Sequence, residues 1–126
     1  MLRSDRVNIK ELVKDAHDNA KAKGWHDEER TFGELIALCH SELSEALEEY
    51  RKGIKMDGIY FKEWSIKRNG KLEDCKKPEG IPIELADCVI RIADMCGKYG
   101  IDLNEAIRIK MEYNKSRSHK HGGKVL

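Results

Sequence analysis

The spacing of apolar and polar residues predicts four helices separated by short breaks. Apolar residues recur every three to four positions in the segments 8–23, 31–52, 82–97 and 102–117, as on one face of an α-helix. Three of these segments begin with capping-box pairs: Asn8 with Glu11, Thr31 with Glu34, and Asp102 with Glu105. The third segment begins instead at Pro82, a residue favoured in the first helical turn, and we expect it to end near 97–100. The sequence therefore predicts an all-α fold.

The segment 53–80 interrupts this helical pattern. Its apolar and aromatic residues cluster in 59–66 and are followed by Asn69 and Gly70. An Asn-Gly pair is a strong hairpin signal, because a type I′ turn needs positive φ at both central residues. We therefore expect a small β-hairpin inserted between the second and third helices, and a basic tail without helical pattern at 118–126.

Composition limits the classes of function. A chain of 126 residues fits one domain, 1–126, and its 24 basic and 23 acidic residues give a net charge of +1. This balance makes nucleic acid an unlikely partner. No apolar stretch approaches the roughly 18 residues of a membrane span, and no signal-peptide core is present. The four cysteines form no CxxC pair, and Cys39, Cys88 and Cys96 fall inside apolar helical patterns, so we expect these three to be buried free thiols. The chain is expected to be a cytoplasmic protein that does not contact a membrane.

Carboxylates gather beside the apolar faces of two predicted helices. Glu42, Glu45 and Glu49 fall in an arc of about 60° on the helix 31–52. Glu84 and Asp87 repeat the i,i+3 spacing on the next helix. Either these are solvated polar flanks, or the two helices pack side by side and four carboxylates converge on one or two metal ions.

The last predicted helix carries charge of the opposite sign. Lys110, Asn114 and Arg117 continue its apolar stripe, where a cation is costly unless it meets an anion. They form either salt bridges to the acidic helices or a phosphate-binding edge. The basic tail at 118–126 either adds to this edge or is only a flexible basic end. An acidic cluster that suits a metal, beside a basic cluster that suits phosphate, indicates polyphosphate chemistry.

The ordered set of these motifs resembles the MazG-like all-α nucleoside triphosphate pyrophosphohydrolases, over roughly two thirds of the chain. The resemblance implies a four-helix core that assembles as a helical-bundle oligomer, a homodimer or homotetramer. It also implies hydrolysis of a nucleoside triphosphate to the monophosphate and pyrophosphate, in nucleotide-pool house-cleaning. Mg²⁺ would be required, with Mn²⁺ as a substitute.

The resemblance further implies a role for each motif residue. Four carboxylates would bind the metal: Glu42, Glu45, Glu84 and Asp87. Glu45 would also help to remove the proton of the attacking water. Five residues would contact the substrate: Lys110, Asn114, Arg117, His121 and Lys124.

Two features depart from the family pattern. Ser41 stands where many members carry a further Glu, which removes one ligand or base. The 46–83 connection between the acidic motifs is longer than usual, and the predicted hairpin accounts for the excess. The alternative function is that of a non-catalytic helical dimer which binds a nucleotide or a protein partner.

Overall fold

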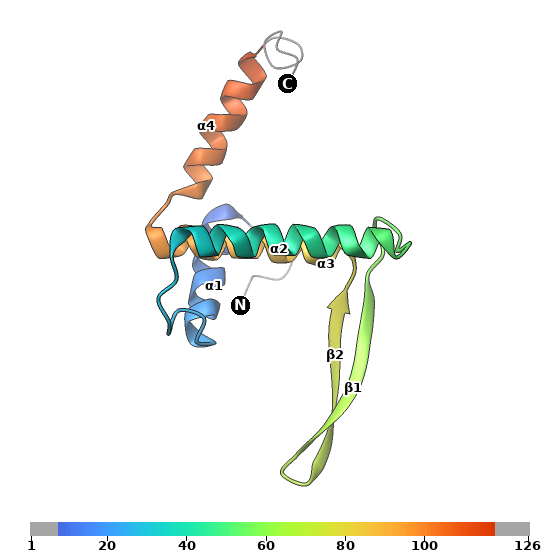
Figure 1. The fold of residues 1–126 in the computed structure, drawn as a ribbon. Coiled ribbons are helices and arrows are strands. Elements are labelled where there is room, and N and C mark those ends of the chain that lie inside the picture. The colour runs from blue at the N-terminus through green and yellow to red at the C-terminus, as the bar shows by residue number, and fades with distance from the viewer. Residues whose placement is uncertain (1–7, 118–126) are drawn as a thin grey trace. The chain divides into compact units, whose positions relative to one another are not determined.

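The computed structural model describes residues 8–117, which form four helices and one β-hairpin (Figure 1). In chain order the elements are α1 (Ile9–Ala22), α2 (Phe32–Arg51), β1 (Tyr60–Arg68), β2 (Lys71–Glu79), α3 (Ile81–Tyr99) and α4 (Leu103–Ser116). The expected mainly helical fold with a small hairpin is confirmed. None of the helices in the described part of the chain contains an apolar stretch of the length that a bilayer crossing requires.

The predicted caps set the starts of three helices. The Thr31 hydroxyl accepts from the Glu34 N–H at 3.1 Å, and the Glu34 carboxylate accepts from the Thr31 N–H at 3.2 Å. The side chains of Asn8 and Asp102 accept from the third backbone N–H of α1 and α4 in the same way, at 2.8 and 3.0 Å. These bonds satisfy N–H groups that have no partner within the helix.

The hairpin is a two-stranded antiparallel sheet whose register runs from Tyr60 opposite Glu79 to Arg68 opposite Lys71. At its turn, Asn69 and Gly70 have φ of 52° and 78°, the positive values that the Asn-Gly pair predicts. At its base, a Cβ on Gly80 would lie 2.2 Å from the carbonyl oxygen of Gly58. Glycine at position 80 therefore allows the two ends of the hairpin to approach closely.

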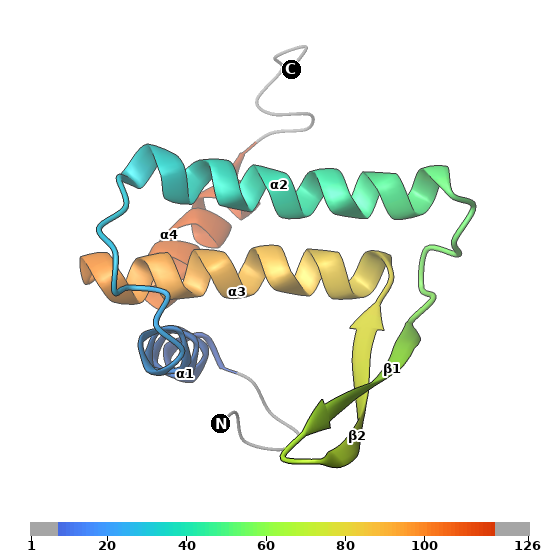
Figure 2. The ribbon, with the colours of Figure 1, turned by 60° about the horizontal axis from the view of Figure 1, so that its bottom comes forward.

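The described chain divides into two compact units, and the larger contains residues 26–92. Within it, α2 and the first part of α3 run antiparallel and side by side, and the hairpin joins the end of α2 to the start of α3 (Figure 2). The buried positions of α2 are Cys39, Glu42, Ala46 and Glu49. Small side chains and carboxylates of α2 thus face α3. Leu43 and Leu47, two of the periodic apolar residues of α2, are instead exposed in the single chain.

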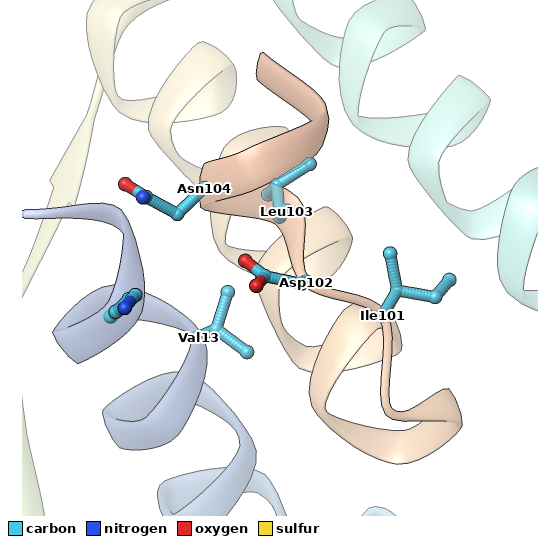
Figure 3. Close-up of a pocket in the computed structure, with 6 residues that line it drawn as sticks. Val13, Ile101, Asp102, Leu103 and Asn104 are labelled. Carbon is cyan, nitrogen blue, oxygen red and sulfur yellow. The ribbon is translucent and has the colours of Figure 1, made fainter. Parts of the chain in front are cut away.

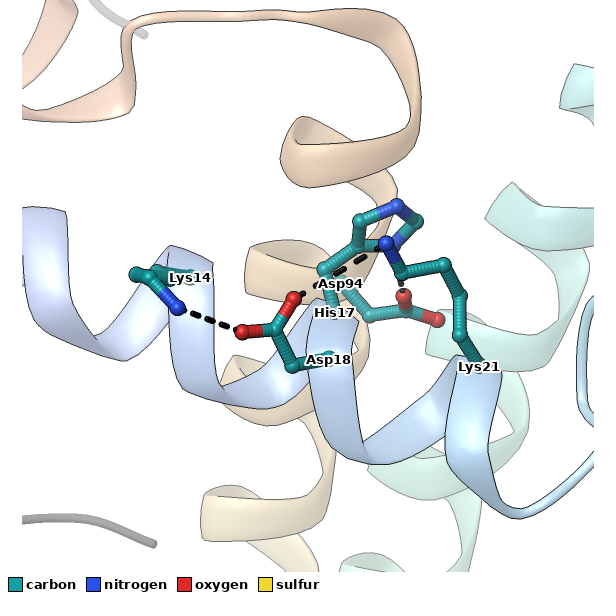
Figure 4. A network of polar contacts seen from close by, with 5 residues as sticks. All are labelled: Lys14, His17, Asp18, Lys21 and Asp94. Carbon is teal, nitrogen blue, oxygen red and sulfur yellow. Dashed lines mark hydrogen bonds and ion pairs between the residues drawn. The ribbon is translucent and has the colours of Figure 1, made fainter.

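The second unit contains α1, the end of α3 and α4. Leu12 and Ala16 of α1 are buried with Ala93 of α3. Beside them, Nδ1 of His17 lies 2.9 Å from Oδ1 of Asp94 (Figure 4). All four cysteines are free thiols, and Cys39, Cys88 and Cys96 are buried as predicted.

Candidate metal centre

Three carboxylates from two helices meet in the larger unit. Glu42 of α2 and Glu84 and Asp87 of α3 each offer one oxygen, and these oxygens lie within 4.8 Å of one another. Glu42 and Glu84 are less than a tenth exposed. Because the helices are antiparallel neighbours and Glu84 and Asp87 are one turn apart, their side chains reach the same side of α3.

The fourth predicted ligand, Glu45, lies beside this group and is hydrogen-bonded to Glu84 through its side chain. Burial of Glu84, this bond and the surrounding negative charges raise the pKa of Glu84 to about 7. Burial and the charge of Glu42 also raise the pKa of Asp87. The structure therefore brings together oxygens of three of the four carboxylates that the sequence singled out, and the fourth, Glu45, lies outside that group but interacts with Glu84.

Arg91 is a member of the cluster to which sequence reasoning gave no role. Its Nε donates a hydrogen bond to Oε1 of Glu42 at 2.7 Å. Arg91 lies one turn after Asp87 on α3, so the helical spacing already placed it on the acidic side. This contact fixes one candidate ligand and offsets part of the negative charge.

A second group of buried carboxylates joins the first at Glu84. Oxygens of Glu49, Glu79 and Glu84 lie within 4.8 Å of one another. The Tyr60 hydroxyl donates to the Glu49 carboxylate, whose oxygens lie at 2.9 and 3.0 Å. The hydrogen bond to Glu49 is the main cause that raises the pKa of Tyr60 to about 12. Glu79 has Nζ atoms of Lys77 and Lys62 at 3.6 and 3.7 Å.

Sequence reasoning did not assign Tyr60, Glu79 or the two lysines to the site. They lie in the insertion, and no motif marks which of its residues return to the helices. The only available signal is their position at the two ends of the predicted hairpin, which must meet where α2 ends and α3 begins.

The predicted substrate-binding residues of α4 belong to the other unit. Lys110 and Asn114 are exposed rather than core-facing, and no described residue of α4 is buried. Nζ of Lys110 and Cζ of Arg117 lie 4.9 and 5.4 Å from the centroid of the Tyr113 ring. His121 and Lys124 fall outside the described residues. A role in substrate binding stays a prediction for all of these residues.

The acidic cluster has the chemistry of a site for a hard divalent cation. Its donors are all carboxylate oxygens, which Mg²⁺ and Mn²⁺ accept, and no thiol or imidazole is in the group. Buried like charges are costly without a compensating cation. The set therefore fits Mg²⁺, with Glu42, Glu84 and Asp87 as the residues able to hold it.

A pocket of about 250 Å³ lies in the second unit, between the start of α1 and the α3–α4 connection (Figure 3). Lys10, Val13 and the segment 101–104 line it. Its one carboxylate, that of Asp102, is already engaged in capping α4. This pocket does not contain the converging charges that the carboxylate cluster has.

Comparison of the chain with family models, curated proteins and solved structures finds no match. Membership of the MazG-like family therefore stays a prediction from the motif residues.

Proposed function

We propose that this chain is a Mg²⁺-dependent enzyme that hydrolyses a nucleoside triphosphate to the monophosphate and pyrophosphate. One observation carries the proposal: carboxylate oxygens of Glu42, Glu84 and Asp87, from two antiparallel helices, lie within 4.8 Å of one another. A bound divalent cation supplies charge neutralisation of a polyphosphate and lowers the pKa of a water molecule.

The chain's own residues would then divide the work. Glu42, Glu84 and Asp87 hold the cation, and Arg91 keeps Glu42 in place. Glu45 is exposed, and its carboxylate takes the proton of a water molecule that attacks the α-phosphorus. As the new oxygen–phosphorus bond forms, the bond from that phosphorus to the oxygen bridging to the β-phosphate breaks, and pyrophosphate leaves with the electron pair.

Under this proposal, Lys110, Asn114 and Arg117 contact the phosphates or sugar, together with His121 and Lys124. What supports this assignment is their chemistry: Arg and Lys side chains bind phosphate oxygens through charge-assisted hydrogen bonds. Their place in the sequence after the acidic motifs matches the resemblance described above.

We also propose that the enzyme is a homo-oligomer, which an exposed apolar face of the larger unit supports. In each helix, the residue directly after a buried contact position points about 100° away from that position around the helix axis. Because α2 and α3 are antiparallel, these positions project to the same side of the pair. They are Leu43, Leu47 and Tyr50 of α2 and Leu85 and Val89 of α3, each 46–60% exposed. Contiguous apolar patches of this kind mark interaction surfaces, and a second copy would cover this one.

The test is pyrophosphate release from a panel of nucleoside and deoxynucleoside triphosphates, with Mg²⁺ and with EDTA. We expect release only with Mg²⁺, with the monophosphate formed in equal amount. If the folded, oligomeric chain releases pyrophosphate from no member of the panel, the proposal is wrong. In that case the carboxylates belong to a binding module for a nucleotide or a protein partner.

A further inference from the structure

The two faces of the hairpin differ in charge. Residues directly opposite in the register share a face, and the face alternates along each strand. The face that includes Tyr60 is basic and carries these charged residues: Lys62, Arg68, Lys71, Glu73, Lys77 and Glu79. Glu79 is buried at the base, so the exposed part of this basic face has four cations and one carboxylate.

The opposite face of the hairpin is balanced. Its charged residues are Glu63, Lys67, Asp74 and Lys76. One ion pair joins Nζ of Lys76 to Oε1 of Glu63 at 3.5 Å. The excess of positive charge is therefore confined to the basic face. The balanced face offers lysines of the same two strands for a matched control.

Two lysines of the basic face stand next to the carboxylate cluster. Lys62 and Lys77 are directly opposite each other, an arrangement of like charges that by itself destabilises a sheet. Both Nζ atoms lie within 3.7 Å of Oε1 of Glu79. Glu79 also belongs to the carboxylate group with Glu49 and Glu84. Burial raises the pKa of Asp87, and the charge of Lys77 acts against that rise. Both lysines thus border the carboxylate group that contains Glu79, and the charge of Lys77 also acts on Asp87 of the other group.

The lysine pair also has charge left over for a ligand. Glu79 balances one of the two ammonium groups, and both lysine side chains are 65% exposed. Arg68 and Lys71 lie six residues further along the strands, roughly 20 Å away, and are too distant to act at the same place. Arg91, the other cation at the cluster, is already engaged with Glu42.

We propose that Lys62 and Lys77 form a phosphate clamp, in which their ammonium groups bind oxygens of the substrate's polyphosphate chain and then of the leaving pyrophosphate. This inference rests on the proposed function, which supplies the substrate class. A triphosphate carries more negative charge than one divalent cation cancels, and lysine binds phosphate as a mobile point charge. The hairpin is then a substrate-binding arm, and the clamp lies outside the motifs of the helices.

Binding of inorganic triphosphate tests the clamp without relying on catalysis. The variant K62A/K77A removes two charges from the basic face, and the control K67A/K76A removes two from the opposite face of the same strands. With Mg²⁺ present, calorimetry should show at least about 30-fold weaker triphosphate binding for K62A/K77A and a change within about twofold for the control. Binding of Mg²⁺ alone should be retained in both variants, and K62R/K77R should keep most of the triphosphate affinity.

Each outcome bears on the clamp. Equal losses in the two alanine variants would mean that only the overall charge matters, and would overturn it. Unchanged triphosphate binding in K62A/K77A, with or without loss of stability, would also overturn the clamp. It would mean that the two lysines serve only as ion-pair partners of Glu79. A wild-type chain that does not bind triphosphate would also overturn the clamp. If triphosphate binds through the lysines while no nucleotide is hydrolysed, the clamp stands and the proposed enzymatic function fails.

Discussion

Arg91 donates its Nε–H to the Oε1 of Glu42 across 2.7 Å, joining α3 to α2 at the edge of the carboxylate cluster. Both side chains are largely buried, with 26% of Arg91 and 9% of Glu42 exposed. Removal of the arginine would leave a carboxylate in low-dielectric surroundings among other carboxylates. The pair therefore links the packing of the two helices to the charge balance of the site.

Arg91→Ala should destabilise the metal-free chain by about 2 kcal/mol, because Glu42 loses a charge-assisted partner. Mg²⁺ should restore part of this loss, since a cation compensates the same carboxylate. Thermal unfolding in EDTA and in Mg²⁺ measures both effects. Arg51→Ala, which removes an exposed partner of Glu48, is the control and should change the melting temperature little in either buffer. Equal melting temperatures for Arg91→Ala and wild type in EDTA would contradict the role assigned to the pair.

Glu45→Gln should lower the rate of pyrophosphate release by about 100-fold or more, because the amide cannot take a proton from water. Glu48→Gln, three residues further along α2 and also exposed, is the matched control and should keep its rate. Circular dichroism would verify that both variants fold. A fully active Glu45→Gln variant would exclude Glu45 as the base.

Affinity for Mg²⁺ should rise with pH through about 7, the pKa of Glu84 in the metal-free chain. A cation must displace the proton that Glu84 holds, so the dissociation constant should increase about tenfold for each pH unit below that value. Titration calorimetry in buffers of different ionisation enthalpy would detect the released proton. A Mg²⁺ affinity that is constant between pH 5.5 and 8 would contradict this prediction.

The same pKa shift sets the opposite trend for stability without metal. The folded-state pKa of Glu84 lies above its ordinary value of 4.5. The contribution of Glu84 to the free energy of unfolding is therefore fully present below pH 4.5 and is lost as the pH rises through about 7. In EDTA at pH 8, Glu84→Gln should therefore melt at a higher temperature than wild type. In Mg²⁺ the order should reverse, because the variant lacks a ligand.

Tyr60→Phe should loosen the base of the hairpin, since buried Glu49 loses the hydroxyl that donates to it. Hydrogen exchange of backbone amides in β1 and β2 should become faster, while α1 should be unaffected. Absorbance titration gives a second measurement: a tyrosine that ionises near pH 12 should be present in wild type and missing from the variant. Phe61→Leu, on the opposite face of the same strand, is the control.

Leu47→Glu should reduce the size of the assembly, because it places a charge on the exposed apolar face of α2. Light scattering coupled to size exclusion measures the mass of the particle. Ser44→Glu, at an exposed polar position of α2, adds the same single negative charge and should leave the mass unchanged. A monomeric wild-type chain would contradict the proposed homo-oligomer.

Local signals in the sequence predicted the helices and the hairpin well. Capping residues such as Thr31 and Asp102 act through bonds three residues away, and Asn69 and Gly70 fix the turn between adjacent strands. Each of these effects is contained within a few residues. For this reason the bounds of the elements could be read without knowledge of their packing.

The candidate site was predictable only where helical spacing determines it. Glu42 and Glu84 lie on known sides of their helices, so their convergence needed only the assumption that α2 and α3 pack together. Tyr60 and Glu79 reach the cluster through the register of the hairpin and the course of the loop 52–59, which no local pattern specifies. The exposed Leu47 shows the same limit, because periodicity marks an apolar face without saying what covers it.

The close approach of Gly58 and Gly80 means that the chain enters and leaves the hairpin at nearly one point. An excursion with adjoining ends can be lengthened, shortened or exchanged without moving the two helices that it interrupts. Shortening it from the turn in whole cross-strand pairs would keep every remaining side chain on its own face, whereas loss of one strand residue would turn the outer part over. The architecture therefore separates the base of the hairpin, where Tyr60 and Glu79 meet the helices, from an outer part whose length can change on its own.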